Sequence, residues 1–170
     1  MTNIEKKEHS RSSLPQIEGE YTLSIPSQTN NLELIRGFVG NIAAKVGFEA
    51  DDVSKIELAC DEACTNVIKH AYVQESVENL LDIFIRVDED KFLLIISDQG
   101  MGFDPTSIKS PDLKQYMAEL KVGGLGIYLM KTLMDDVIYD INPGVRNQVT
   151  MVKYFVNRNQ AEMANPESKS

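Results

Sequence analysis

Two apolar segments separated by a short polar one constrain the fold of this chain more than any other feature. In residues 80–87, "LLDIFIRV", apolar side chains recur at every second position from Leu81 to Val87, which predicts a strand with one buried face. The segment at 91–97, "KFLLIIS", is apolar at both sets of alternating positions, as is typical of a strand in the middle of a sheet. The polar residues between them, "DEDK" at 88–91, predict a hairpin.

A first helix is expected in residues 32–48, "LELIRGFVGNIAAKVGF", where apolar side chains recur every three or four positions. Thr29 or Asn30 is expected to cap its start, and Gly47 is placed to end it. The expected buried stripe consists of Leu32, Ile35, Phe38, Val39, Ile42 and Val46.

A second helix is expected to follow Asp51 and Asp52, because acidic side chains suit the positive end of a helix dipole. A third is expected in "GIYLMKTLMDDV", residues 126–137. Their expected core positions are Val53, Ile56, Cys60, Ala63 and Val67 in the second helix, and Ile127, Met130 and Leu133 in the third.

Three more segments have the alternation of strands. They are "EYTLSIPS", whose Pro26 suits the edge of a sheet, and the pair "VIYDI" and "QVTMVKYFV", which a turn at 142–144 connects. The resulting order is strand, helix, helix, strand, strand, helix, strand, strand. This order predicts an α+β fold, a two-layer α/β sandwich in which helices cover one face of a mostly antiparallel mixed sheet.

The length of 170 residues fits one domain, expected at 19–157, and the polar segments 1–18 and 158–170 are expected to be flexible tails. With 17 basic and 26 acidic residues the net charge is -9. This charge argues against direct nucleic-acid binding and against binding to an anionic membrane.

The chain has no apolar run long enough to span a bilayer and no secretion signal, so we expect a cytoplasmic protein. Its two cysteines, Cys60 and Cys64, lack a second pair for a zinc site and are expected to be buried thiols.

Polar groups on the second helix form the first candidate site. Leu58, Glu62, Asn66 and Lys69 share a helix face beside the core stripe. A carboxylate and a carboxamide one turn apart there could hold Mg²⁺, which prefers oxygen ligands. A solvated helix face with scattered polar residues would give the same pattern.

Two glycine-rich segments are further candidates. In "SDQGMGFDP", Asp98 follows the most apolar strand, and Gly100 and Gly102 would allow a ligand to approach the backbone. In "KVGGLGIYLMKTL", glycines precede a helix, and the exposed N-H groups of a helix start suit phosphate oxygens. An ordinary turn and a linker, respectively, remain alternatives, and the second segment fits neither a Walker loop nor a dinucleotide fingerprint.

Taken in order over about residues 57–130, the segments "EACTN", "DQGMG" and "GGLG" resemble the N box and the two glycine boxes of the GHKL (histidine-kinase-like) ATPase superfamily. Within it the chain looks most like the anti-sigma-factor serine/threonine protein kinases of the RsbW and SpoIIAB type, because "DEACTNVIKHAY" is similar to their N box. The resemblance implies the Bergerat-type ATP-binding fold, with ATP and Mg²⁺ as cofactors.

The resemblance also implies roles for individual residues. Glu62 would be the general base, Asn66 would bind Mg²⁺ and the nucleotide, and Asp98 would accept a hydrogen bond from the adenine amino group. The other residues implied to bind ATP are Gly100 and Gly102 at the adenine, and Gly123, Gly124, Leu125 and Gly126 near the phosphates. Residues 104–122 would form a lid, whose Lys109, Lys114 and Lys121 are either phosphate contacts or solvated side chains.

The chain departs from the family pattern where the last strand begins. Family members often carry a Gly-Thr pair there, whereas "RNQVTM" offers Asn147 and, further along, Thr150. A hydroxyl contact to the base is therefore open. Lys69 is expected to have a supporting role, and His70 is either a ligand contact or a packing residue at the helix end.

The function implied is an ATP- and magnesium-dependent kinase that phosphorylates an anti-anti-sigma partner with a STAS domain and sequesters a sigma factor, with a homodimer as a further possibility. The alternative is an ATP-binding, sequestering module with weak or no kinase activity. The carboxylate of Glu62 favours the enzyme, since a pure binding protein has no need of a base there.

Overall fold

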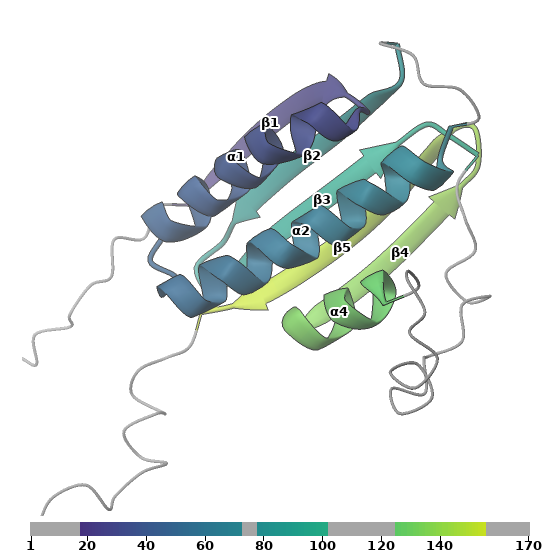
Figure 1. The fold of residues 1–170 in the computed structure, drawn as a ribbon. Coiled ribbons are helices and arrows are strands. Elements are labelled where there is room, and N and C mark those ends of the chain that lie inside the picture. The colour runs from purple at the N-terminus through teal and green to yellow at the C-terminus, as the bar shows by residue number, and fades with distance from the viewer. Residues whose placement is uncertain (1–17, 73–77, 102–124, 156–170) are drawn as a thin grey trace, which may run out of the picture.

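The computed structural model describes residues 18–72, 78–101 and 125–155, and these form two layers (Figure 1). A five-stranded sheet has the order β1-β2-β3-β5-β4, and every neighbouring pair in it is antiparallel. The strands are β1 (Gly19–Pro26), β2 (Leu80–Val87), β3 (Lys91–Asp98), β4 (Asp136–Asn142) and β5 (Arg146–Tyr154). The helices are α1 (Leu32–Lys45), α2 (Ala50–His70) and α4 (Gly126–Leu133), with a short 3-10 turn at Thr29–Asn31 before α1.

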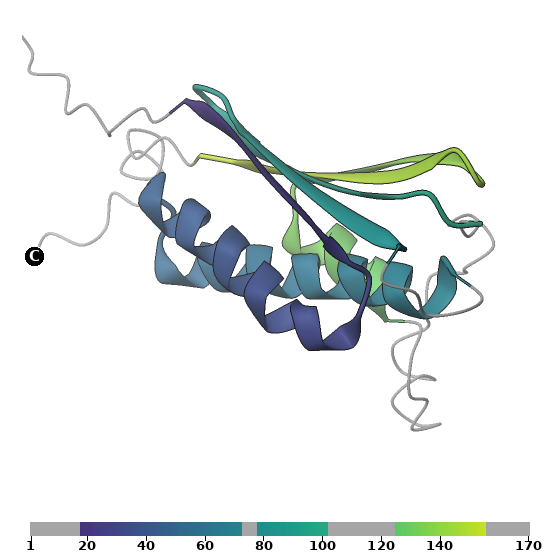
Figure 2. The ribbon, with the colours of Figure 1, turned by 90° about the horizontal axis from the view of Figure 1, so that it is seen from above.

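The described helices α1, α2 and α4 all lie on one face of the sheet, as the edge-on view in Figure 2 shows. The predicted α+β two-layer sandwich is therefore confirmed. The sheet of the described residues contains no parallel pair, so it is simpler than the mixed sheet that the sequence leads us to expect. Strand β3 lies in the middle of the sheet and β1 lies at one edge, both as predicted.

The core lies between the sheet and the helices because the inward side chains of the central strands are apolar. Ile83 on β2 pairs with Ile96 on β3, and Leu94 on β3 pairs with Met151 on β5. These four side chains are at most 1% exposed. From the helices, Val39, Ile56, Cys60, Ala63 and Cys64 complete this core. Both cysteines are free and buried, as predicted.

The helix ends agree with the sequence in part. Gly47 follows α1 with φ of +105°, a conformation that favours glycine. The expected capping by Thr29 or Asn30 is wrong, because both residues belong to the 3-10 turn and no side chain caps α1. Instead, Asn31 donates a hydrogen bond from Nδ2 to the carbonyl oxygen of Pro26 at 2.8 Å. Helix α2 has Asp51 and Asp52 in its first turn, as expected.

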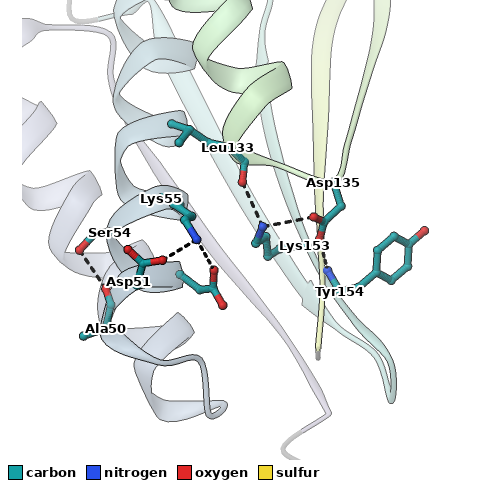
Figure 3. Close-up of polar contacts among 9 residues, drawn as sticks. Ala50, Asp51, Ser54, Lys55, Leu133, Asp135, Lys153 and Tyr154 are labelled. Carbon is teal, nitrogen blue, oxygen red and sulfur yellow. Dashed lines mark hydrogen bonds and ion pairs between the residues drawn. The ribbon is translucent and has the colours of Figure 1, made fainter. Parts of the chain in front are cut away.

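Polar contacts attach the C-terminal end of α4 to β5 (Figure 3). The ammonium group of Lys153 donates to the carbonyl oxygen of Leu133 at 3.1 Å and to Asp135 Oδ1 at 3.2 Å. The backbone N-H of Tyr154 donates to Asp135 Oδ2 at 2.7 Å. A cation on the last carbonyl groups of a helix satisfies them and opposes the negative end of the dipole. These contacts hold the C-terminal end of α4 in place. The helix ends at Leu133, which is earlier than its apolar pattern predicts.

The predicted tails lie outside the described residues except for Glu18, and the limits of the domain stay a prediction. No helix in the described part of the chain is long and apolar enough to cross a membrane.

Candidate functional site

The described part of the segment "DQGMG", residues 98–101, begins at the end of β3 and lies against the C-terminal end of α2. The N-H of Met101 donates to the carbonyl oxygen of Ala71 at 2.8 Å, and the N-H of Gln99 donates to the hydroxyl of Tyr72 at 3.2 Å. A Cβ atom on Gly100 would lie 2.1 Å from the Ala71 carbonyl oxygen, so a side chain would displace backbone there. Glycine at this position therefore lets the loop approach the helix that carries Glu62 and Asn66.

The second glycine-rich segment reaches the same helix from α4. Gly126 is the first residue of α4, and a Cβ atom there would lie 2.7 Å from Glu62 Oε2 and 3.6 Å from Asn66 Oδ1. Leu125 is the N-cap residue of α4. The predicted base, the predicted metal ligand and the start of the glycine-preceded helix thus lie together.

A cavity that is partly open to solvent lies between α2, α4 and the strands β3, β4 and β5. Asn66 and Asp98, predicted from two different motifs, both line it. Its other lining residues are Ala63, Val67, Ala71, Ile96, Met130, Tyr139, Ile141, Asn147, Gln148 and Val149. Apolar walls with a few polar groups are typical of a site for a small organic ligand.

The buried carboxylate of Asp98 is held by hydrogen bonds to one of its oxygens. Asp98 Oδ1 accepts from the N-H of Gly100 at 2.8 Å and from Asn147 Nδ2 at 3.0 Å. Asn147 Nδ2 also donates to the carbonyl oxygen of Gly100 at 2.9 Å, and the N-H of Gly144 donates to the same carbonyl at 2.8 Å. Asp98 is 6% exposed and Asn147 is 3% exposed, so this network fixes the carboxylate at the cavity.

The carboxamide oxygen of Asn147 is buried and has no hydrogen-bond partner among the described residues. An acceptor left in this state costs about 1–3 kcal/mol. Together with the Asp98 carboxylate it presents hydrogen-bond acceptors beside apolar walls, which fits a flat ligand that carries an amino group. The sequence points to Asn147 only as a departure from a family pattern. Its contact with Asp98, 49 residues away, follows from the pairing of β3 with β5.

Thr150, the other residue offered by the last strand, does not line the cavity. Along β5 the buried side chains of Asn147, Val149 and Met151 alternate with the less buried Gln148 and Thr150. Successive side chains of a strand point to opposite faces, so Thr150 lies on the face away from Val149 and Met151, which the helices leave uncovered (Figure 2). A hydroxyl contact from Thr150 to a base in the cavity is therefore ruled out in this arrangement.

The remaining predicted residues are placed as follows. Lys69 and His70 are exposed at the end of α2, and neither lines the cavity. The other predicted positions lie outside the described residues: Gly102, Gly123, Gly124, Lys109, Lys114, Lys121 and the lid at 104–122.

Burial also affects two tyrosines near the site. It raises the pKa of Tyr139, on β4, from 10.0 to about 12, because the ionised form would lose its solvation. Burial raises the pKa of Tyr72 as well, although the hydrogen bond from Gln99 opposes this shift. Both hydroxyl groups are therefore neutral at physiological pH.

The donor set at the α2 end of the site fits a hard cation that takes further ligands from phosphate oxygens and water. Glu62 and Asn66 contribute carboxylate and carboxamide groups one helical turn apart. In the described residues no group of three or more His, Cys, Asp or Glu side chains could hold a metal by itself. In proteins Mg²⁺ is usually held by one or two carboxylates together with the phosphates of the substrate.

Comparison with known proteins places this geometry in a family. The model of the histidine kinase-like ATPase domain family matches residues 25–153. The serine-protein kinase RsbW of Bacillus licheniformis is 37% identical over 142 residues, which cover 81% of this chain and 86% of that protein. The RsbW proteins of Bacillus subtilis and Staphylococcus aureus are 36% and 33% identical, each over 78% of this chain, and over 84% and 85% of their own lengths.

Two solved structures share the fold at low sequence identity. The structure of the RsbU and RsbW domains of a Mycobacterium tuberculosis protein superposes with a TM-score of 0.58 at 12% identity, over 82% of this chain and 35% of that one. The SiaB-SiaC complex of Pseudomonas aeruginosa also gives a TM-score of 0.58, at 14% identity, over 81% of this chain and 90% of that one.

The family model spans the residues from which the cavity is built, and the match covers 84–86% of the length of the RsbW relatives. The chain therefore belongs to the histidine kinase-like ATPase domain family, and within it to the RsbW type of serine-protein kinase.

Proposed function

We propose that this chain binds ATP with Mg²⁺ in the cavity beside Asp98 and transfers the terminal phosphate to a serine or threonine of a partner protein. The observation that carries the proposal is the convergence of three motifs on α2. Gly126 lies against Glu62 and Asn66, Gly100 lies against Ala71, and Asn66 and Asp98 line one cavity.

Each residue has a role that its position supports. The carboxylate of Asp98, fixed by Gly100 and Asn147, accepts a hydrogen bond from the amino group of adenine. Apolar side chains on either side of the cavity, such as Ile96 and Met130, enclose the base and exclude water. Binding energy spent on the base positions the phosphates for reaction.

The phosphate end of the nucleotide lies toward Asn66 and the start of α4. Asn66 supplies a carboxamide oxygen for Mg²⁺, and the first N-H groups of α4 face phosphate oxygens with Gly126 keeping the approach open. When bound, Mg²⁺ would neutralise negative charge on the phosphates. Glu62, half-buried on the same face of α2, accepts the proton of the attacking hydroxyl group.

The acceptor protein is proposed from the kind of kinase to which the chain belongs. We infer an anti-anti-sigma protein with a STAS domain as the phosphorylated partner and a sigma factor as the sequestered one, with a homodimer as the binding unit. The alternative is a sequestering module with weak or no kinase activity. In the experiment below, such a module would bind ATP but label no partner.

The test is transfer of label from the terminal phosphate of ATP to a candidate STAS protein. The native chain, Glu62→Ala and Asn66→Ala are incubated with labelled ATP and Mg²⁺. We expect labelling by the native chain, loss of labelling with Glu62→Ala while ATP still binds, and weakened ATP binding with Asn66→Ala.

If ATP binding is unaffected in Asn66→Ala, the assignment of the site is wrong. If ATP binds but neither the native chain nor Glu62→Ala labels any partner, the protein is the sequestering module instead. Glu57→Ala serves as a control, because Glu57 lies on the same helix beside α1 and outside the cavity.

A further inference from the structure

The carboxamide of Asn147 lies beside Asp98 at the cavity, and among the described residues only its NH₂ group, not its oxygen, makes hydrogen bonds. Its Nδ2 donates to Asp98 Oδ1 and to the carbonyl oxygen of Gly100. Its Oδ1 is buried and, within the described part of the chain, has no donor. A side chain that is 97% buried and holds an unmet acceptor at a cavity indicates a ligand.

The orientation of this carboxamide follows from its neighbours. A carboxylate oxygen and a backbone carbonyl oxygen only accept hydrogen bonds, so the NH₂ group of Asn147 must face them and its oxygen must face away. The two distances, 3.0 Å and 2.9 Å, leave both N-H groups engaged. A free asparagine could offer a base both a donor and an acceptor. Here Asn147 can offer only an acceptor.

We propose that Asn147 Oδ1 is a second acceptor for the exocyclic amino group of adenine and makes Asn147 a specificity-determining residue. This inference rests on the proposed function, since it needs the adenine base in the cavity. The amino group of adenine carries two N-H donors, and Asp98 and Asn147 match them with two buried acceptors. A base with an oxo group at this position would bring an acceptor against two acceptors, which leaves buried polar groups unpaired.

Thr150 provides the matched control. It lies on the same strand, three residues further along, on the face of the sheet away from the cavity. Its hydroxyl has no role in base recognition under this proposal, although a family pattern would lead one to look for a hydroxyl on this strand.

The experiment compares two nucleotides that differ by one donor. The dissociation constants of ATP and N6-methyl-ATP, each with Mg²⁺, are measured by calorimetry for the native chain, Asn147→Ala and Thr150→Ala. N6-methyl-ATP has a single N-H on its amino group. We expect the native chain and Thr150→Ala to prefer ATP by about tenfold, the effect of one buried acceptor left unpaired.

In Asn147→Ala this preference should fall to near one, because Asp98 alone needs one N-H and the shortened side chain leaves room for the methyl group. Asn147→Ser provides a second variant with the same expectation, since its hydroxyl does not reach the position of Oδ1. Far-UV circular dichroism and a cooperative unfolding transition establish that each variant is folded.

Two results would overturn the inference while the proposed function stands. The native chain could bind ATP and N6-methyl-ATP equally well, or Asn147→Ala could weaken both nucleotides by the same factor and keep the native preference. The second result would mean that Asn147 only positions Asp98. A native chain that binds neither nucleotide would instead overturn the proposed function and this inference together.

Discussion

At the scale of single residues, glycine positions decide how closely the parts of the site approach. Gly126 faces the carboxylate of Glu62, and a methyl group there would lie 2.7 Å from Oε2. Because this oxygen ends a flexible side chain, Glu62 can move aside without unfolding the protein. The result would be a folded protein with a displaced base.

We therefore expect Gly126→Ala to lower the rate of phosphate transfer by about 10- to 100-fold, as displacement of a catalytic group does. Its free energy of unfolding should change by less than about 1 kcal/mol. The control is Gly37→Ala on the exposed side of α1, where a Cβ atom meets nothing within 4 Å. This control should gain about 0.5–1 kcal/mol of stability and keep full activity. Native transfer rates in Gly126→Ala would contradict the placement of Glu62.

At the scale of elements, α4 is held by its C-terminal end. The side chain of Lys153 is 12% exposed and bonds both the last turn of α4 and Asp135. Substituting Lys153→Met keeps the length and apolar stem of the side chain but removes its donors. We expect a loss of about 1.5–3 kcal/mol in the free energy of unfolding, typical of hydrogen bonds that involve a charged group. Urea unfolding measures this loss.

The control for that prediction is Lys131→Met, an exposed lysine in the last turn of the same helix. It should lose less than about 1 kcal/mol, the size of a surface interaction with the helix dipole. Equal urea midpoints for Lys153→Met and Lys131→Met would show that the contacts of Lys153 do not hold α4 in place.

Strand β4 brings a titrating group to the cavity. Burial raises the pKa of Tyr139 from 10.0 to about 12 in the folded protein, so folding favours the neutral phenol. This contribution to stability is fully present below pH 10 and is lost as the pH rises from 10 to about 12. Tyr139→Phe should therefore lose stability less steeply than the native chain over this interval, when both are unfolded by urea at a series of pH values. The same pH dependence in both proteins would show that Tyr139 is not the group responsible.

At the scale of the whole molecule, local patterns predict the elements better than their arrangement. The hairpin of β2 and β3, the central position of β3 and the edge position of β1 all follow from alternation, turn residues and Pro26. The pairing of β5 with β3 does not follow from local patterns, because it joins residues 49 to 63 positions apart. The start of α1 is mispredicted because capping residues also suit a 3-10 turn, and Thr29 and Asn30 form one.

The same limit applies to the site. Glu62, Asn66 and Asp98 are candidates from the sequence because each belongs to a motif read along the chain. Asn147 acquires its meaning from the β3-β5 pairing, which places it opposite Asp98. Conversely, Thr150 is a reasonable candidate in the sequence but faces the other side of the sheet. A residue's side of the sheet depends on strand register, and a shift of one residue reverses it.

The central claim is that three separate sequence motifs build one ATP site around Asp98, and binding of MgATP to Asp98→Asn tests it most directly. Calorimetry is applied to the native chain, to Asp98→Asn and to Asp140→Asn, an exposed acidic residue on β4. We expect the native chain and Asp140→Asn to bind with the same affinity. Asp98→Asn should bind at least about tenfold more weakly, because the charged acceptor is lost. Equal affinity in all three proteins, or no binding by the native chain, would contradict the claim.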